Sequence, residues 1–123
     1  MLAYVTIGTN DLPRAAAYYD ELLAVLGGTR MMEGEQYVAW TTTPDAAGLG
    51  VTKPFDGNAA TVGNGVMVGL QAPDRDTADR LHAKALELGG SDEGAPGQRW
   101  EGFYAGYFRD LDGNKLNVCY FGA

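Results

Sequence analysis

The sequence is poor in cysteine, histidine and basic residues, and it has no long apolar run. Its single cysteine, Cys119, has no partner for an internal disulfide, which is consistent with a reducing compartment such as the cytoplasm. No stretch approaches the roughly 20 apolar residues that span a bilayer, and no basic segment precedes the first apolar stretch. The sequence therefore predicts a cytoplasmic protein without a transmembrane helix or a signal peptide.

Acidic residues outnumber basic residues by sixteen to nine, which gives the 123-residue chain a formal net charge of −7. That charge repels nucleic-acid phosphates and no stripe of lysine or arginine offsets it, so we expect neither a nucleic acid nor a membrane as partner. A small neutral or cationic ligand is compatible with the charge, although an acidic surface more often only keeps a protein in solution. The length and the hydrophobic content of 46% predict a single globular domain.

The first half of the chain predicts a β-α-β-β-β order. A strand pattern covers residues 3–9, and a helix follows from an N-cap at Asn10-Asp11 to a stop at Gly27-Gly28. Three short strand candidates come after this helix: Thr29–Glu33, Gln36–Thr42 and Leu49–Lys53.

The second half repeats this plan. Its elements are a strand at Val66–Leu70, a helix that opens at Pro73-Asp74 and stops at Gly89-Gly90, a weak strand near 90–92, a loop at 95–102, and strands at Phe103–Arg109 and Asn114–Phe121. Matching positions such as Val5 and Val66, or Gly27 and Gly89, lie 61 or 62 residues apart. This periodicity predicts an internal duplication, with module one at 2–53, a linker at 54–64 and module two at 65–121.

The last two strands flank the segment Asp110-Leu-Asp-Gly-Asn114, which has the chemistry of a tight turn. Aspartate side chains cap nearby backbone N–H groups, and Gly113 can adopt a positive φ without steric strain. We therefore predict a β-hairpin, and its spacing alone does not distinguish an ordinary hairpin from a functional strand pair.

Side chains alternate across a strand, so a helix packed on one side of a sheet leaves the other side for a different contact. The apolar, β-branched residues are expected on the helix-packing side: Val5, Ile7, Val66, Val68, Leu70, Leu116 and Val118. Glycines, short polar groups and two larger side chains are expected on the other side: Tyr4, Thr6, Gly8, Met67, Gly69, Asn117 and Cys119. Such a lining predicts a cup for a small, partly apolar molecule, unless a second sheet or subunit covers it.

Three features occur together: the duplicated β-α-β-β-β plan, the opening Tyr-Val-Thr-Ile-Gly-Thr-Asn-Asp-Leu, and the closing Tyr-Phe-Arg-Asp-Leu-Asp-Gly-Asn-Lys-Leu. Together they resemble the vicinal oxygen chelate superfamily, which includes glyoxalases, fosfomycin- and bleomycin-resistance proteins and extradiol dioxygenases. The resemblance covers almost the whole chain. It implies an α+β fold in which two βαβββ modules form a U-shaped curved sheet, and a homodimer, since members usually pair.

Enzymes of that superfamily bind a divalent metal in the cup, and by this resemblance their ligand positions carry other residues here. The two histidines correspond to Tyr4 and Met67, and the closing glutamate corresponds to Asn117. The remaining ligand falls near Gly50 or Val51, where no carboxylate stands. A phenol, a thioether and an amide are weak ligands for a hard cation at neutral pH. We therefore expect no metal and no other cofactor.

Neither His82 nor Cys119 is expected to be catalytic. His82 lies at the margin of the apolar stripe of the second helix, where a histidine is more often structural or exposed than a ligand. Cys119 has no histidine or lysine at a spacing that would lower its pKa, so a structural thiol is the simpler interpretation. Trp100, in the predicted loop beside Arg99 and Glu101, indicates a mobile flap with a stacking surface.

We predict a metal-independent protein that binds a small organic molecule in the cup, with no catalytic residue assigned. The expected ligand-binding residues are Tyr4, Thr6, Trp40, Met67, Trp100, Tyr104, Asn117 and Cys119. One alternative is a glyoxalase-like lyase or isomerase whose metal is held by carboxylates among Glu33, Glu35, Glu93 and Glu101. Another alternative is a ligand-free, dimeric accessory domain.

Overall fold

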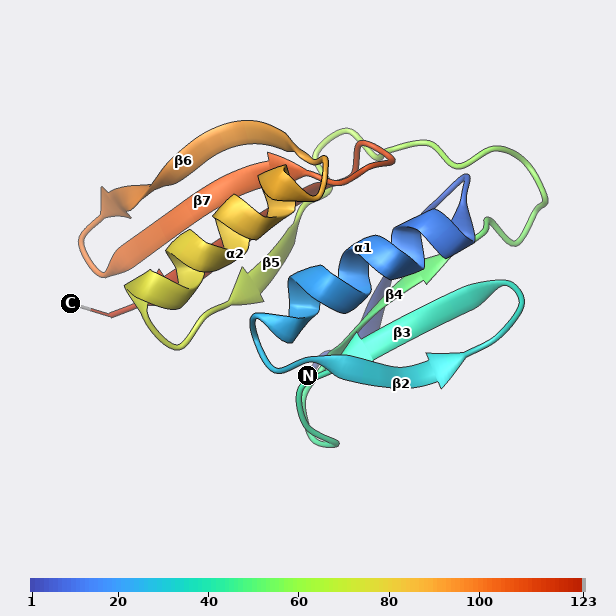
Figure 1. Cartoon of the computed structure of the whole chain (residues 1–123), viewed down its shortest axis with the longest axis horizontal. Helices are drawn as coiled ribbons and strands as arrows, with labels where there is room; N and C mark the ends of the chain where they lie inside the picture. Colours follow the sequence, from blue (N-terminus) through green and yellow to red (C-terminus); the bar gives the residue numbers. More distant parts are fainter. Residues whose placement is uncertain (123) are drawn as a thin grey trace. The chain divides into compact units, whose positions relative to one another are not determined.

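The computed structural model describes residues 1–122 and divides the chain into two compact units, with the boundary in the sequence between Val62 and Gly63. Unit 1 contains β1 (Tyr4–Gly8), α1 (Leu12–Ala24), β2 (Thr29–Glu33), β3 (Tyr37–Thr41) and β4 (Gly48–Thr52). Unit 2 contains β5 (Val68–Gln71), α2 (Arg75–Glu87), β6 (Ser91–Trp100), β7 (Phe103–Arg109) and β8 (Lys115–Phe121). The predicted α+β class and the two βαβββ modules are confirmed (Figure 1).

Both units use the same sheet topology. The strand order is β1-β4-β3-β2 in unit 1 and β5-β8-β7-β6 in unit 2, and in each sheet the first strand pairs in parallel with the last. A parallel pair needs a crossover, and the single helix of each unit supplies it by packing on one side of its own sheet (Figure 1). Among the described residues, neither helix is long and apolar enough to cross a membrane.

The two helices begin at aspartate caps. The Asp11 side chain accepts a hydrogen bond from the Arg14 backbone N–H at 3.1 Å, and the Asp74 side chain accepts one from Thr77 at 2.7 Å. Each cap satisfies a backbone donor that has no partner within the helix. The apolar stripe that follows each cap is buried, including Leu22 in α1 and Leu81 in α2.

The structure corrects the predicted loop at 95–102. Residues from Ser91 to Trp100 form one long strand, β6, which pairs with β7 through several register shifts. Pro96 lies in one of these irregular stretches, between the paired residues Gly94 and Gly97, where the missing N–H removes no ladder hydrogen bond. The prediction of a flap was therefore wrong, because bulges let a glycine- and proline-containing segment stay in the sheet.

The predicted bounds of the first strand in the second module are also corrected. β5 begins at Val68, so Val66 precedes the strand and is exposed, contrary to its predicted place on the helix-packing side. Gly65, with φ of 96°, forms the turn just before it. The apolar alternation at 66–70 begins two residues before the observed strand, which is why the predicted strand started too early.

The turn between β7 and β8 is held by Asp110. Its Oδ1 accepts hydrogen bonds from the backbone N–H groups of Asp112 and Asn114, both at 2.9 Å, and its Oδ2 accepts one from Asn114 Nδ2 at 3.0 Å. Gly113 has φ of 87°, as the turn requires. Asp110 and Asn114 are both buried, so these bonds are made away from water.

We predict that Asp110→Ala lowers the free energy of unfolding by about 2–3 kcal/mol, because buried donors in the turn lose a charged acceptor. Asp110→Asn, which keeps an acceptor oxygen, should lose less. Urea unfolding followed by circular dichroism measures the change. Asp45→Ala, at an exposed loop aspartate, is the control and should stay within about 0.5 kcal/mol of the wild type. Equal effects at the two positions would contradict the role given to Asp110.

Candidate ligand-binding face

In unit 1, α1 covers the side of the sheet that carries Trp40. The Trp40 Nε1–H donates a hydrogen bond to Asp20 Oδ1 on α1 at 2.8 Å, and the Trp40 ring lies 5.7 Å from that of Tyr19. Cross-strand partners share a side, so Leu49 and Val5 belong to this helix side as well. Tyr4 and Thr6 alternate with Val5 and project from the opposite, helix-free side.

Trp40 therefore belongs to the core of unit 1, and its proposed stacking role is corrected. Only 1% of the residue is exposed, and the one polar atom of its side chain donates its hydrogen bond to Asp20. Asp20 also receives two hydrogen bonds from Arg30, at 2.9 and 2.7 Å. The hydrogen bond from Arg30 lowers the pKa of Asp20 below its ordinary value.

Tyr104 is likewise on the helix side, in unit 2. Its hydroxyl donates a hydrogen bond to Asp79 Oδ1 of α2 at 2.5 Å, and Arg75 lies 4.9 Å from the centre of its ring. The hydrogen bond to Asp79 raises the pKa of Tyr104. Tyr104 thus holds α2 on the sheet and does not share a side with the other predicted ligand-binding residues of this unit.

The helix-free side of unit 2 brings together Asn117, Cys119 and Trp100. Strand register places Tyr107 opposite Asn117, Ala105 opposite Cys119, and Phe103 opposite both Phe121 and Trp100. We call this surface the unit 2 face, defined by Trp100, Phe103, Ala105, Tyr107, Asn117, Cys119 and Phe121. Ala105 and Cys119 are buried between larger aromatic side chains, and Phe103 packs with them.

Asn117 is unusual among the polar residues of this face. It is only 3% exposed, and its Oδ1 has no hydrogen-bond partner among the described residues. The oxygen lies beside Gly69, where an added Cβ would come within 2.9 Å of it. A larger residue than glycine at position 69 would thus force this amide to move.

Two cations lie against the Tyr107 ring on the same face. The Arg99 guanidinium carbon is 5.3 Å and the Lys115 Nζ is 5.8 Å from the ring centre. Tyr107 and Lys115 are not recognisable as site residues from the sequence, since only the register of the strands brings them together. The signal available was the alternation that places both on the side of Asn117.

Trp100 supplies the exposed apolar part of the face. Its ring stacks on Phe103 at 4.5 Å with an interplanar angle of 14°, and the residue is 63% exposed. The Phe121 ring, on the neighbouring strand β8, has its centre 5.0 Å from that of Phe103. The stack fixes the indole at the end of β6, and the role of Trp100 in stacking on a ligand stays a prediction.

In unit 1 the helix-free side is more open. Tyr4 and Thr6 are exposed there, and Gly50 and Ala39 lie beside Thr6. Met67 immediately precedes β5 in unit 2 and is exposed. The predicted ligand-binding residues therefore divide between the two units, with Asn117, Cys119 and Trp100 sharing one face.

Comparison with known proteins then identifies the family. The glyoxalase/bleomycin resistance protein/dioxygenase superfamily matches residues 1–118. The chain belongs to this superfamily. A glyoxalase/bleomycin resistance protein from Albidiferax ferrireducens is 35% identical over 98% of both chains, with a TM-score of 0.90. A search of curated proteins found no match.

Two more distant structures share the fold. A superfamily enzyme from Burkholderia phytofirmans is 15% identical over 97% of both chains, with a TM-score of 0.76. A lactoylglutathione lyase from Agrobacterium tumefaciens is 21% identical, covers 98% of this chain and 92% of its own, and has a TM-score of 0.69.

The metal that the superfamily implies does not fit the donors of this chain. Asn117 offers one neutral amide oxygen, and Tyr4 and Met67 offer a phenol and a thioether. Of the alternative carboxylates, Glu33 is paired with Arg30 at 2.7 Å and Glu93 with Arg109 at 2.5 Å. Within residues 1–122, no three histidine, cysteine, aspartate or glutamate side chains gather as a metal site.

His82 is a structural residue of unit 2. It is buried on α2, with Nε2 3.1 Å from Asp92 Oδ1 and 3.0 Å from the Tyr107 carbonyl oxygen, and its ring meets Phe108 edge-on. Both neighbouring atoms are acceptors, so Nε2 carries the hydrogen and donates it. The histidine thereby ties the helix to β6 and β7.

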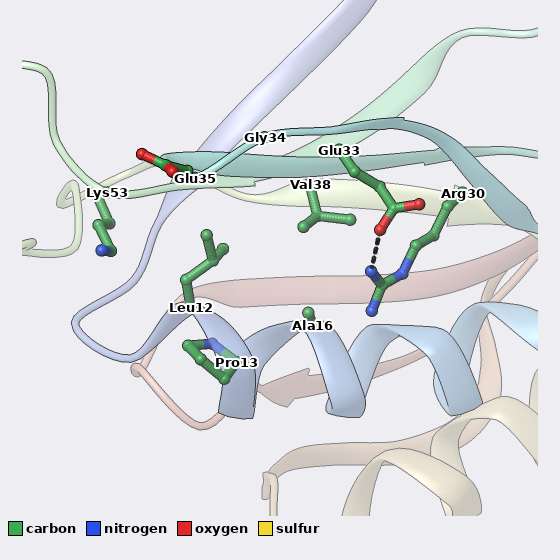
Figure 2. A pocket seen from close by; sticks show the side chains of 9 residues that line it. All are labelled: Leu12, Pro13, Ala16, Arg30, Glu33, Gly34, Glu35, Val38 and Lys53. Carbon is green, nitrogen blue, oxygen red and sulfur yellow. Dashed lines mark hydrogen bonds and ion pairs between the residues drawn. The ribbon is translucent and has the colours of Figure 1, made fainter.

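A separate pocket of about 460 Å³ lies in unit 1, where the first turn of α1 faces the β2–β3 hairpin (Figure 2). Its apolar lining includes Leu12 and Val38, which places it on the helix side of the sheet. The Arg30–Glu33 ion pair stands at one end, and Glu35 and Lys53 stand at the other (Figure 2). The sequence contains no signal for this pocket, because each lining residue has an ordinary local explanation.

The first prediction from this geometry concerns Asp20. Asp20→Ala should lower the free energy of unfolding by about 1–2 kcal/mol, because it leaves the buried Trp40 N–H without an acceptor. Asp20→Asn keeps that acceptor and should cost less, since the ion pair with Arg30 is partly exposed. Glu21→Ala, the next residue on α1 and exposed, is the control.

The lowered pKa of Asp20 predicts that its contribution to the free energy of unfolding depends on pH. Its folded pKa is lowered, so its stabilising contribution is present above the ordinary value of 3.8 and is lost as the pH falls through the folded pKa. The stability difference between wild type and Asp20→Asn should therefore shrink from about pH 7 to about pH 2. Urea midpoints across this range measure it, and a constant difference would rule out the linkage.

The second prediction concerns Cys119. Burial raises the pKa of its thiol, so little thiolate is available in the folded protein. A disulfide reagent such as DTNB should react roughly tenfold or more slowly with the native protein than with the protein in concentrated urea. Equal rates in the two states would instead indicate an activated, accessible cysteine.

Proposed function

We propose that this protein binds a small organic molecule on the unit 2 face and does so without a metal ion. The observation that carries the proposal is the buried Asn117 Oδ1, an acceptor without a partner among the described residues. A ligand with an O–H or N–H group would supply the missing donor. Superfamily membership supplies the scaffold for such a site, and the choice of ligand rests on these residues.

The energetic reason is the cost of the unpaired carbonyl. A buried acceptor without a donor costs about 1–3 kcal/mol, and folded proteins retain few of them. An apolar residue of similar size at position 117 would avoid that cost. An amide oxygen without a partner, which occupies the space beside Gly69, is therefore consistent with a group kept for binding.

Trp100 and its neighbours would bind the apolar part of the ligand. The exposed indole is held flat by Phe103, so stacking on it requires little ordering of the protein. Cys119 and Ala105, small residues beside Asn117 in the sheet, would form the floor. Met67, in the segment just before β5 of the same unit, remains a proposed contact. Tyr4 and Thr6, on the helix-free side of unit 1, stay predictions from the sequence.

Metal independence is proposed from the chemistry of the side chains. Asn117 lacks the negative charge with which a carboxylate holds a divalent cation, and Glu33 and Glu93 are already paired with arginines. A glyoxalase-like lyase would need a metal site from other residues, and a dimeric accessory domain would bind no small molecule. Pairing into a homodimer, implied by the family resemblance, is compatible with each of these functions.

The test uses Asn117→Leu, which keeps the size of the side chain and removes its polar atoms. The variant should be at least as stable as the wild type, because the unpaired acceptor is gone. It should lose binding to those fragments of a small-molecule library that raise the melting temperature of the EDTA-treated wild type. Asn58→Leu, in an exposed loop, is the control and should retain binding.

Three results would contradict the proposal. They are a library in which no fragment stabilises the wild type, fragments that stabilise Asn117→Leu equally, or stoichiometric metal in the purified protein by elemental analysis. The first favours the accessory domain, and the last favours the metal-dependent lyase. Size-exclusion chromatography of the same samples reports the oligomeric state.

A further inference from the structure

The unit 2 face has a local charge opposite to that of the whole chain. The net charge is −7, yet Arg99, Arg109 and Lys115 all lie on this face, with Glu93 bonded to Arg109. Arg109 also donates a hydrogen bond to the Gly113 carbonyl oxygen, so it has both a carboxylate and a carbonyl partner. Arg99 and Lys115 are the cations left to meet a ligand.

Neither of these two cations has a carboxylate partner among the described residues. Arg99 donates one hydrogen bond to the Ala95 carbonyl oxygen at 2.7 Å, which fixes its guanidinium near the Tyr107 ring. Lys115 is half-buried with its ammonium group near the same ring. Contact with an aromatic ring stabilises each cation only modestly, and an anion would interact with both more strongly.

The spacing of these groups along β8 limits the ligand further. Lys115 and Asn117 are two residues apart on the same side of the strand, so their Cα atoms are separated by about 7 Å. Tyr107 lies directly across from Asn117, and its ring is the one that both cations contact. An anionic group at Arg99 and Lys115 and a donor at Asn117 Oδ1 would thus be about one six-membered ring apart.

We infer that the ligand of the unit 2 face is a small organic anion that carries a hydroxyl or N–H group about one ring away from its charge. The anion binds Arg99 and Lys115 beside Tyr107, and the donor binds Asn117. This inference rests on the proposed function and revises the expectation, drawn from net charge alone, of a neutral or cationic ligand. Charges in contact with a ligand outweigh more distant ones, which solvent and salt screen.

The test compares two probes of the same shape, 4-hydroxybenzoate and 4-hydroxybenzamide, with binding measured by calorimetry. The acid should bind about tenfold more tightly than the neutral amide, because only the acid has a charge for Arg99 and Lys115. Salt dependence is not the readout, because the net charge and the local cations act in opposite directions. Both probes carry the phenol that would donate to Asn117.

Variants locate the charge. Lys115→Met and Arg99→Met should each weaken binding of the acid about tenfold and leave binding of the amide nearly unchanged. Lys84→Met removes the same charge from α2, on the helix side of unit 2, and should change neither. Asn117→Leu should weaken the acid and the amide equally, since it removes the acceptor and no charge.

The outcomes separate this inference from the proposed function. Equal binding of the acid and the amide, or acid binding unaffected by Lys115→Met and Arg99→Met, would overturn the inference that the ligand is an anion. The proposal that the unit 2 face binds a ligand would still stand. Failure of both probes to bind the wild type would overturn the inference as well. The proposed function fails with it only if the fragment library also gives no binder that depends on Asn117.

Discussion

The alternation of side chains across each strand is the constraint on which the rest of this structure depends. Each unit has one helix for one sheet, so one side is packed and the other is free. Trp40 and Tyr104 bond to residues of the helices, whereas Asn117 and Trp100 project from the free side of unit 2. A shift of one residue in register would exchange these roles.

The polar groups on the two sides of the sheets differ in their hydrogen bonding. On the helix side, the Trp40 N–H meets Asp20, and the Tyr104 hydroxyl meets Asp79. On the free side of unit 2, the Asn117 oxygen is buried without a described partner, although it lies in the middle of a well-packed sheet. A stable fold tolerates such an atom poorly, and this contrast is the reason for assigning the free side to a ligand.

Much of the fold could be predicted because its signals are local. The helix caps at Asp11 and Asp74, the Asp110 turn and the apolar stripes each depend on residues within a few positions of one another. β6 could not be predicted in full, because Gly94, Pro96 and Gly97 read as a loop until β7 is present to pair with them. Within the candidate site, the alternation of side chains along β8 was enough to place Asn117 and Cys119 on the same side of the sheet. It was not enough to predict on which side Trp40, Trp100 and Tyr104 lie.

The sequence by itself determined the duplicated βαβββ plan and the hairpin turn, because periodicity and turn chemistry depend on residues that are close together along the chain. Only the tertiary structure decided that Trp40 and Tyr104 belong to helix contacts, and that Arg99 and Lys115 meet at Tyr107. Those contacts join separate elements. They depend on strand register and on the side that the helix covers, and both are fixed only when the sheet assembles.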